Sequence, residues 1–263
     1  MIFGQYRESP NKGDGMKKYI TATVIAGLAA GSAFAGANLT MDVATAHVFR
    51  GATVVDSIVV QPNLELSGFG IPEEYGSLAL GAWGSTAPFD DSTPSFDSIY
   101  ETDWYLAYTL PQLVEGLDLY AKYTQYQYSF ALDEKELGFG AGYELGGFML
   151  GGSANFMIDD RNFATEDQVY FDFTADYGLD LSEEVEVVVG GLLSYMIQGD
   201  GNDILLSNGF NHYELYVAAD YALGEMWSID GSLAYIGQLD SDVLSNAAHD
   251  VGLLARIGFS CDL

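Results

Sequence analysis

The chain has 263 residues, with 9 Lys and Arg against 38 Asp and Glu, and a formal net charge of −29 at pH 7. This acidity makes nucleic acid and anionic surfaces poor partners. A charged chain with few hydrophobic residues would be disordered, but 49% hydrophobic and 14% aromatic residues exclude that class and predict a folded protein.

The N-terminal region carries an export pattern. Residues 16–35 combine Lys17 and Lys18, a short apolar run and the small-residue site Ala33-Phe34-Ala35. This order is typical of a cleaved secretory signal peptide, and the apolar run is too short for a membrane-spanning helix. We predict that residues 1–15 are an upstream extension from a misplaced start, residues 16–35 the signal peptide, and residues 36–263 the mature domain. Cleavage would make the mature chain more acidic still, because most of the removed charges are basic.

The mature region is dominated by alternating apolar and polar residues. In the clearest copy, Phe171 and Phe173 belong to the apolar set, and Asp172 and Asp176 to the polar set. Period two is that of a β-strand, and a strand that crosses a bilayer at a tilt needs about 9–11 residues. Pro62 is unfavourable in a paired strand, but its segment alternates like the others. The predicted strands are Asn38–Phe49, Val59–Ser67, Ser77–Thr86, Ile99–Leu110, Leu117–Phe130, Glu136–Leu145, Phe148–Ile158, Gln168–Leu179, Val185–Ile197, His212–Leu223, Trp227–Leu239 and His249–Phe259.

The connections between these strands alternate between long and short. An outer-membrane barrel has short periplasmic turns, longer outer loops and both termini on the periplasmic side. Closure of the sheet also removes the edges that such long hairpins would expose. The sequence therefore predicts an all-β protein, a transmembrane antiparallel up-and-down β-barrel of about twelve strands. We expect it in the outer membrane of a Gram-negative-type bacterium, in contact with outer-membrane lipid and lipopolysaccharide.

The last predicted strand alternates from Val251 to Phe259, as in barrels whose final strand carries the signal for the barrel-assembly machinery. That machinery is therefore an expected partner. Such barrels usually end on the aromatic residue, whereas four residues, 260–263, follow Phe259 here.

Acidic residues gather on the polar face of the strands. A carboxylate facing lipid near the midplane would be costly, so these side chains are expected to point inward. An acidic lumen favours cations, which indicates a porin for passive diffusion of small solutes, cations among them. A non-conducting structural or surface-interaction barrel is the alternative, favoured by inward tyrosines such as Tyr126 and Tyr170. The expected lumen-lining acids are Asp42, Glu65, Glu101, Asp103, Asp118, Asp172, Asp176, Glu214, Asp220 and Asp230.

His47, His212 and His249 are all predicted at the outer ends of strands. An outer-leaflet lipid hydrolase, the second alternative, needs a Ser and an orienting group beside one His, and no G-x-S-x-G motif is present. We interpret the histidines as residues at headgroup level and predict no enzyme activity, no cofactor and no metal site. The acidic loops at Asp90-Asp91 and 199–203 lack a complete calcium loop, and are interpreted as solvated.

Short glycine-aromatic motifs add a resemblance. The motifs are Val48-Phe49-Arg50-Gly51, Ser67-Gly68-Phe69 and the segment 81–85, G-A-W-G-S. The first half of the mature chain thus resembles the TorF-type porin family, also described as the Gcw_chp family of conserved exported proteins. The resemblance implies an outer-membrane barrel and supplies no transported substrate. Arg50, at the outer rim, is expected to pair with a wall carboxylate and pin the first loop, or to face lipopolysaccharide phosphate.

Overall fold

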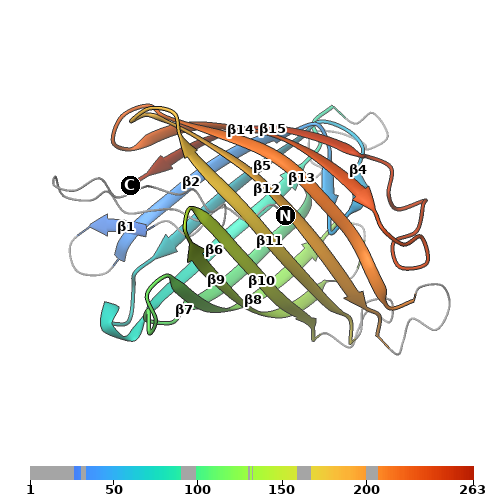
Figure 1. Cartoon of the computed structure of the whole chain (residues 1–263), viewed down its shortest axis with the longest axis horizontal. Helices are drawn as coiled ribbons and strands as arrows, with labels where there is room; N and C mark the ends of the chain where they lie inside the picture. The colour runs from blue at the N-terminus through green and yellow to red at the C-terminus, as the bar shows by residue number, and fades with distance from the viewer. Residues whose placement is uncertain are drawn as a thin grey trace.

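The computed structural model describes residues 27–30, 34–89, 99–129, 131, 133–158, 167–199 and 207–263, and within these ranges twelve antiparallel strands form a closed barrel (Figure 1). Each strand pairs with its neighbours along the chain, and the last pairs with the first. The predicted fold class is therefore confirmed. The barrel strands are β2 (Phe34–Ala44), β5 (Val59–Ser67), β6 (Ser77–Thr86), β7 (Ile99–Thr109), β8 (Leu117–Tyr128), β9 (Glu134–Leu145), β10 (Phe148–Met157), β11 (Val169–Asp180), β12 (Val185–Ile197), β13 (Gly209–Ala222), β14 (Trp227–Gln238) and β15 (Leu253–Asp262).

A short strand, β1, and a 3-10 turn, η1, accompany the first barrel strands. Strand β1 (Gly27–Ala30) pairs with the start of β2, next to the end of β15. The 3-10 turn η1 (Glu73–Tyr75) precedes β6. Among the residues described, no helix is long and apolar enough to cross a membrane.

The two faces of the wall are opposite in character. Side chains of the apolar set point outward, and Phe173, Leu215 and Ile257 are 55%, 59% and 58% exposed. The inner face holds polar side chains, and Glu65 and Asp103 are at most 1% exposed. A protein that folds in water would bury the first group and expose the second, so lipid is the solvent that suits this outer face.

The strand boundaries follow the predicted ones to within two residues except at the first and last strands and at β13, which begins at Gly209 rather than at His212. Strand β2 ends at Ala44 rather than at Phe49, because the chain turns into the barrel interior there. Strand β15 runs from Leu253 to Asp262, so residues beyond Phe259 still pair with β14 and β2. At Pro62 the ladder between β5 and β6 is interrupted, since proline has no N–H to donate.

The segment after β2 forms a small hairpin of its own. Strands β3 (His47–Phe49) and β4 (Ala52–Val55) pair with each other and with no barrel strand. Their two-residue turn has positive φ at both positions, 53° at Arg50 and 81° at Gly51. That is the backbone of a type I′ turn, in which glycine is favoured and arginine is strained. The positive φ that this turn requires thus explains the glycine at the end of the Val48–Gly51 motif.

A second loop, between β14 and β15, packs against this hairpin. Val243 and Leu244 of the loop are buried. The backbone N–H of Thr53 donates to the carbonyl oxygen of Ala248 at 2.7 Å, and the ring of His249 lies 3.1 Å from the carbonyl oxygen of Gly51. Because β15 and β2 are neighbours in the barrel, the two loops emerge side by side and support each other.

Candidate functional site in the barrel interior

The β3–β4 hairpin crosses the barrel interior and is held on the far wall by Arg50. The Arg50 guanidinium lies 2.5 Å from a carboxylate oxygen of Glu136 on β9, and both side chains are buried. The same guanidinium lies over the rings of Phe49 and Tyr170, 4.8 Å and 4.3 Å from their centroids. Burial acts to lower the pKa of Arg50, but Glu136, Tyr126 and Tyr170 together outweigh burial and raise that pKa above its ordinary value. The expected pairing with a wall carboxylate is found, inside the barrel rather than at its rim.

A β-bulge on β13 forms the second anchor of the hairpin. The register between β12 and β13 shifts so that Asn211 and His212 both oppose Ser194. As a result both side chains point inward, where they are 2% and 1% exposed. The side-chain amide of Asn211 donates to the carbonyl oxygen of Arg50 at 2.8 Å. A Cβ atom on Gly51 would come within 2.7 Å of the His212 ring, so glycine is required there by space as well as by its φ.

The bulge also assembles a Ser-His-Glu group that the sequence did not reveal. Ser194 Oγ lies 2.7 Å from His212 Nδ1, and His212 Nε2 lies 3.3 Å from Glu214 Oε1. Ser194 is fully buried, and its hydroxyl also lies 3.0 Å from the His212 carbonyl and accepts the His212 backbone N–H. The group faces the hairpin on the inner side of the wall, away from lipid. It therefore lacks the access that a hydrolase of membrane lipid needs, and it serves to hold the bulge.

His47 also lies inside, which corrects its interpretation as a residue at headgroup level, as the position of His212 does for that residue. The His47 side chain is 5% exposed, with its ring 5.4 Å from that of Trp83 and its Nε2 3.6 Å from a carboxylate oxygen of Glu101. Burial lowers the pKa of His47 to about 4, so the imidazole is neutral at neutral pH. His249 lies in the loop between β14 and β15, beside the hairpin.

The structure places the ten predicted acids on inward positions of their strands and gives most of them polar partners. Asp172 accepts a 2.5 Å hydrogen bond from Ser153, and Asp176 accepts one from the hydroxyl of Tyr216. Arg256 bridges Asp42 and Asp230 at 3.2 Å and 3.4 Å. Four more are Glu65, which accepts from Tyr105 at 2.8 Å; Asp118, near Gln112 at one barrel end; Asp220, opposite Asp230; and Glu214, beside His212. The remaining two, Glu101 and Asp103, lie on β7, where Glu101 is near His47.

Two buried inward acids were missed by the sequence analysis. Glu134 and Glu136 on β9 are 7% and 5% exposed, and Glu136 also accepts a hydrogen bond from Tyr126 at 3.0 Å. The sequence did contain a sign of their direction, because Glu134 and Glu136 alternate in step with Gly138 and Gly140 and out of step with the outward Phe139. They lie at the start of their strand, where the alternating pattern is short and gives the weakest assignment of faces.

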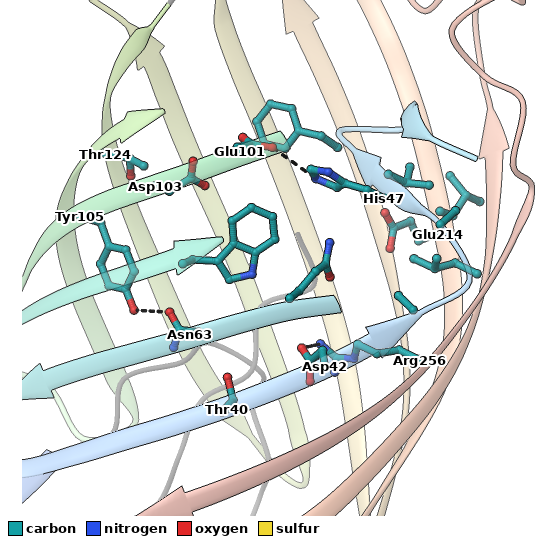
Figure 2. Close-up of a pocket in the computed structure, with 18 of the residues that line it drawn as sticks. Thr40, Asp42, His47, Asn63, Glu101, Asp103, Tyr105, Thr124, Glu214 and Arg256 are labelled. Carbon is teal, nitrogen blue, oxygen red and sulfur yellow. Dashed lines mark hydrogen bonds and ion pairs between the residues drawn. The ribbon is translucent and has the colours of Figure 1, made fainter. Parts of the chain in front are cut away.

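Four acids gather around a cavity on one side of the hairpin. Figure 2 shows Asp42, Glu101, Asp103 and Glu214 around this space, which has a volume of about 130 Å³. A smaller cavity of about 40 Å³ lies beside Arg50 and shares Phe49, Lys122, Thr124 and Glu214 with the first. Residues of the hairpin thus line both cavities.

Asp90-Asp91 and residues 200–203 of the acidic loops lie outside the described residues. Among the residues within the described ranges, no three His, Cys, Asp or Glu side chains are grouped as ligands of a metal ion.

Comparison with known proteins identifies the fold and no family. No family model matches the sequence, and no curated protein matches it. Among the solved structures similar to this chain, the KdgM porin aligns over 86% of this chain and 98% of its own length, at 8% identity with a TM-score of 0.50. The NanC porin aligns over 86% of this chain and 100% of its own length, at 9% identity with a TM-score of 0.52. The chain has a porin-type barrel fold. At these identities the alignment shows a shared barrel fold, and it does not indicate which solutes this chain would pass.

Proposed function

We propose that this porin-type barrel is an outer-membrane channel for small solutes and that it prefers cations. The observation that carries the proposal is the acidic inner face, where Lys122, Arg256 and the hairpin's Arg50 are few bases against many carboxylates. Charges in a narrow, partly dehydrated lumen act over several ångströms, because the Debye length at physiological salt is about 8 Å. The field inside therefore attracts cations and repels anions.

The apolar outer wall supports a location in the outer membrane, after export and cleavage behind Ala35. Cleavage there leaves the barrel intact, since the pairing of β2 with β5 and β15 involves Gly36 and later residues. Lipid and lipopolysaccharide would then surround the wall, and β15 would be the strand read by the assembly machinery. The TorF-type family is proposed as the relative on its short motifs alone.

A non-conducting barrel is the second candidate, and one observation favours it. The hairpin is docked across the lumen by a buried ion pair, and inward tyrosines such as Tyr126 and Tyr170 pack against it. A structural or surface-interaction protein would need no open path. We do not propose a lipid hydrolase, since Ser194 is buried on the inner side of the wall.

Planar-bilayer recording separates the two candidates. Purified protein should give conductance steps, and the reversal potential across a KCl gradient should favour K⁺ over Cl⁻, less so at high salt. Replacing Asp172 and Asp176 with Asn should reduce this preference, because two inward charges are removed at nearly constant volume. Asp250→Asn, in the outer loop, is the matched control and should leave selectivity unchanged. Silence at all salt concentrations would leave the non-conducting barrel, and anion selectivity would refute the electrostatic argument.

A further inference from the structure

A row of three inward side chains crosses strands β5, β6 and β7. The register pairs Asn63 directly with Trp83, and Trp83 directly with Asp103. Neighbouring strands lie about 4.8 Å apart, so an amide and a carboxylate flank one indole ring. All three residues line the 130 Å³ cavity beside the hairpin, and Figure 2 shows Asn63 and Asp103 on two sides of this space.

Polar atoms in this row are buried without hydrogen bonds. Asp103 is 1% exposed, and neither of its carboxylate oxygens forms a geometrically sound hydrogen bond within the described structure. Asn63 is 5% exposed; its oxygen accepts from Tyr105 at 3.2 Å, while its Nδ2 donates to no described group. The same is true of Nδ1 of His47 on the hairpin side. Buried polar groups of native proteins are normally satisfied, so this cavity is suited to a polar occupant.

The charge of the cavity selects the sign of that occupant. Glu101 lies two residues before Asp103 on the same face of β7, so both carboxyl groups face the cavity. Of the bases that line the cavity, Arg256 is already engaged with Asp42 and Asp230. Lys122 lies with its Nζ 4.3 Å from the centroid of the Tyr105 ring, and no carboxylate of the described residues forms an ion pair with it. The protein's own ammonium group thus already rests on an aromatic ring in this cavity.

We infer that the cavity binds a small organic ammonium ion, held between the indole of Trp83 and the carboxylates of Asp103 and Glu101. Tryptophan is the best aromatic partner for an ammonium group, and desolvation strengthens the contact. A cavity of about 150 Å³ holds benzene, so 130 Å³ suits an ion of that size. The Asn63 amide would donate to an oxygen of the ligand. This inference deepens the proposed function and rests on it, since the ion would be a solute that enters the lumen.

Choline chloride is the probe, and Trp83 is the reporter. The chain has three tryptophans, and Trp104 and Trp227 are 51% and 43% exposed on the outer wall. A Trp104→Phe/Trp227→Phe background therefore isolates Trp83 emission in detergent micelles. Titration with choline at constant ionic strength should give a saturable change. Asp103→Asn should raise the dissociation constant at least about tenfold, because a charge-assisted contact is lost. Asp176→Asn, an inward acid outside the cavity, is the matched control and should leave the constant within about twofold.

Folding of each variant is checked by its heat-modifiable migration, and Glu101→Gln provides a second variant if Asp103→Asn does not fold. A linear response, an equal response to NaCl or MgCl₂, or equal constants for Asp103→Asn and Asp176→Asn would overturn the inference. The absence of any response to choline, which is expected if Glu101 and Asp103 share a proton, would overturn it as well. The titration requires no conductance. If the protein forms a cation-selective channel but does not bind choline, only this site is refuted. If it binds choline but gives no conductance, only the channel is refuted.

Discussion

Replacing Arg50 with Met should release the β3–β4 hairpin from the far wall. The change removes the 2.5 Å contact with Glu136 and the contacts with the rings of Phe49 and Tyr170. Glu136 would remain buried without its partner, a loss of about 3–5 kcal/mol for a buried ion pair broken on one side. Since about 1.4 kcal/mol is a factor of ten, docking of the hairpin should weaken at least a hundredfold.

The assay has two readouts. Amide hydrogen exchange of residues 45–58 should accelerate, and single-channel conductance should rise. Arg256→Met is the matched control, because it removes the same charge from the barrel wall and leaves the hairpin contacts in place. The double variant Arg50→Met/Glu136→Leu should restore slow exchange, since no unpaired charge remains. If Arg50→Met and Arg256→Met behaved alike in both readouts, Arg50 would not hold the hairpin and the reasoning would be refuted.

Two further predictions concern pH and export. His47 has a pKa of about 4 in the docked hairpin, against 6.5 for a free imidazole, so the undocked hairpin binds the proton more tightly. Docking should be strongest above pH 6.5 and weaken as the pH falls towards 4, which hydrogen exchange of residues 45–58 should show. His47→Gln should remove this pH dependence. An unchanged pH dependence in that variant would exclude His47 as the titrating group. Mass spectrometry of exported protein should give Gly36 as the first residue, and the mature chain should fractionate with outer membranes and migrate differently before and after boiling; a soluble periplasmic pool would contradict the barrel in its proposed location.

The alternation of side chains was sufficient to predict the wall. At Val169–Asp180 the apolar and polar sets differ so clearly that a shift by one residue would place Asp172 and Asp176 in lipid. Lipid on one side and water on the other thus determine which face each residue takes, and both conditions act on local sequence. The same holds for the inward direction of Glu101 and Asp103 and for the positions of most strand ends.

The contents of the barrel depend on contacts that no local pattern encodes. Arg50 and Glu136 are 86 positions apart, and Asn211 and Arg50 are 161 apart. Within β2 and the residues after it, alternation continues to Phe49, so the sequence predicted one strand where the chain turns inward. The bulge that brings Ser194 to His212 comes from an extra residue at Asn211, which lies before the predicted start of that strand and so outside its alternating pattern. The sequence by itself therefore determined the wall of this barrel and its polarity. Only the tertiary structure decided where the first loop lies, because its position depends on the buried ion pair and hydrogen bonds that it finds across the lumen.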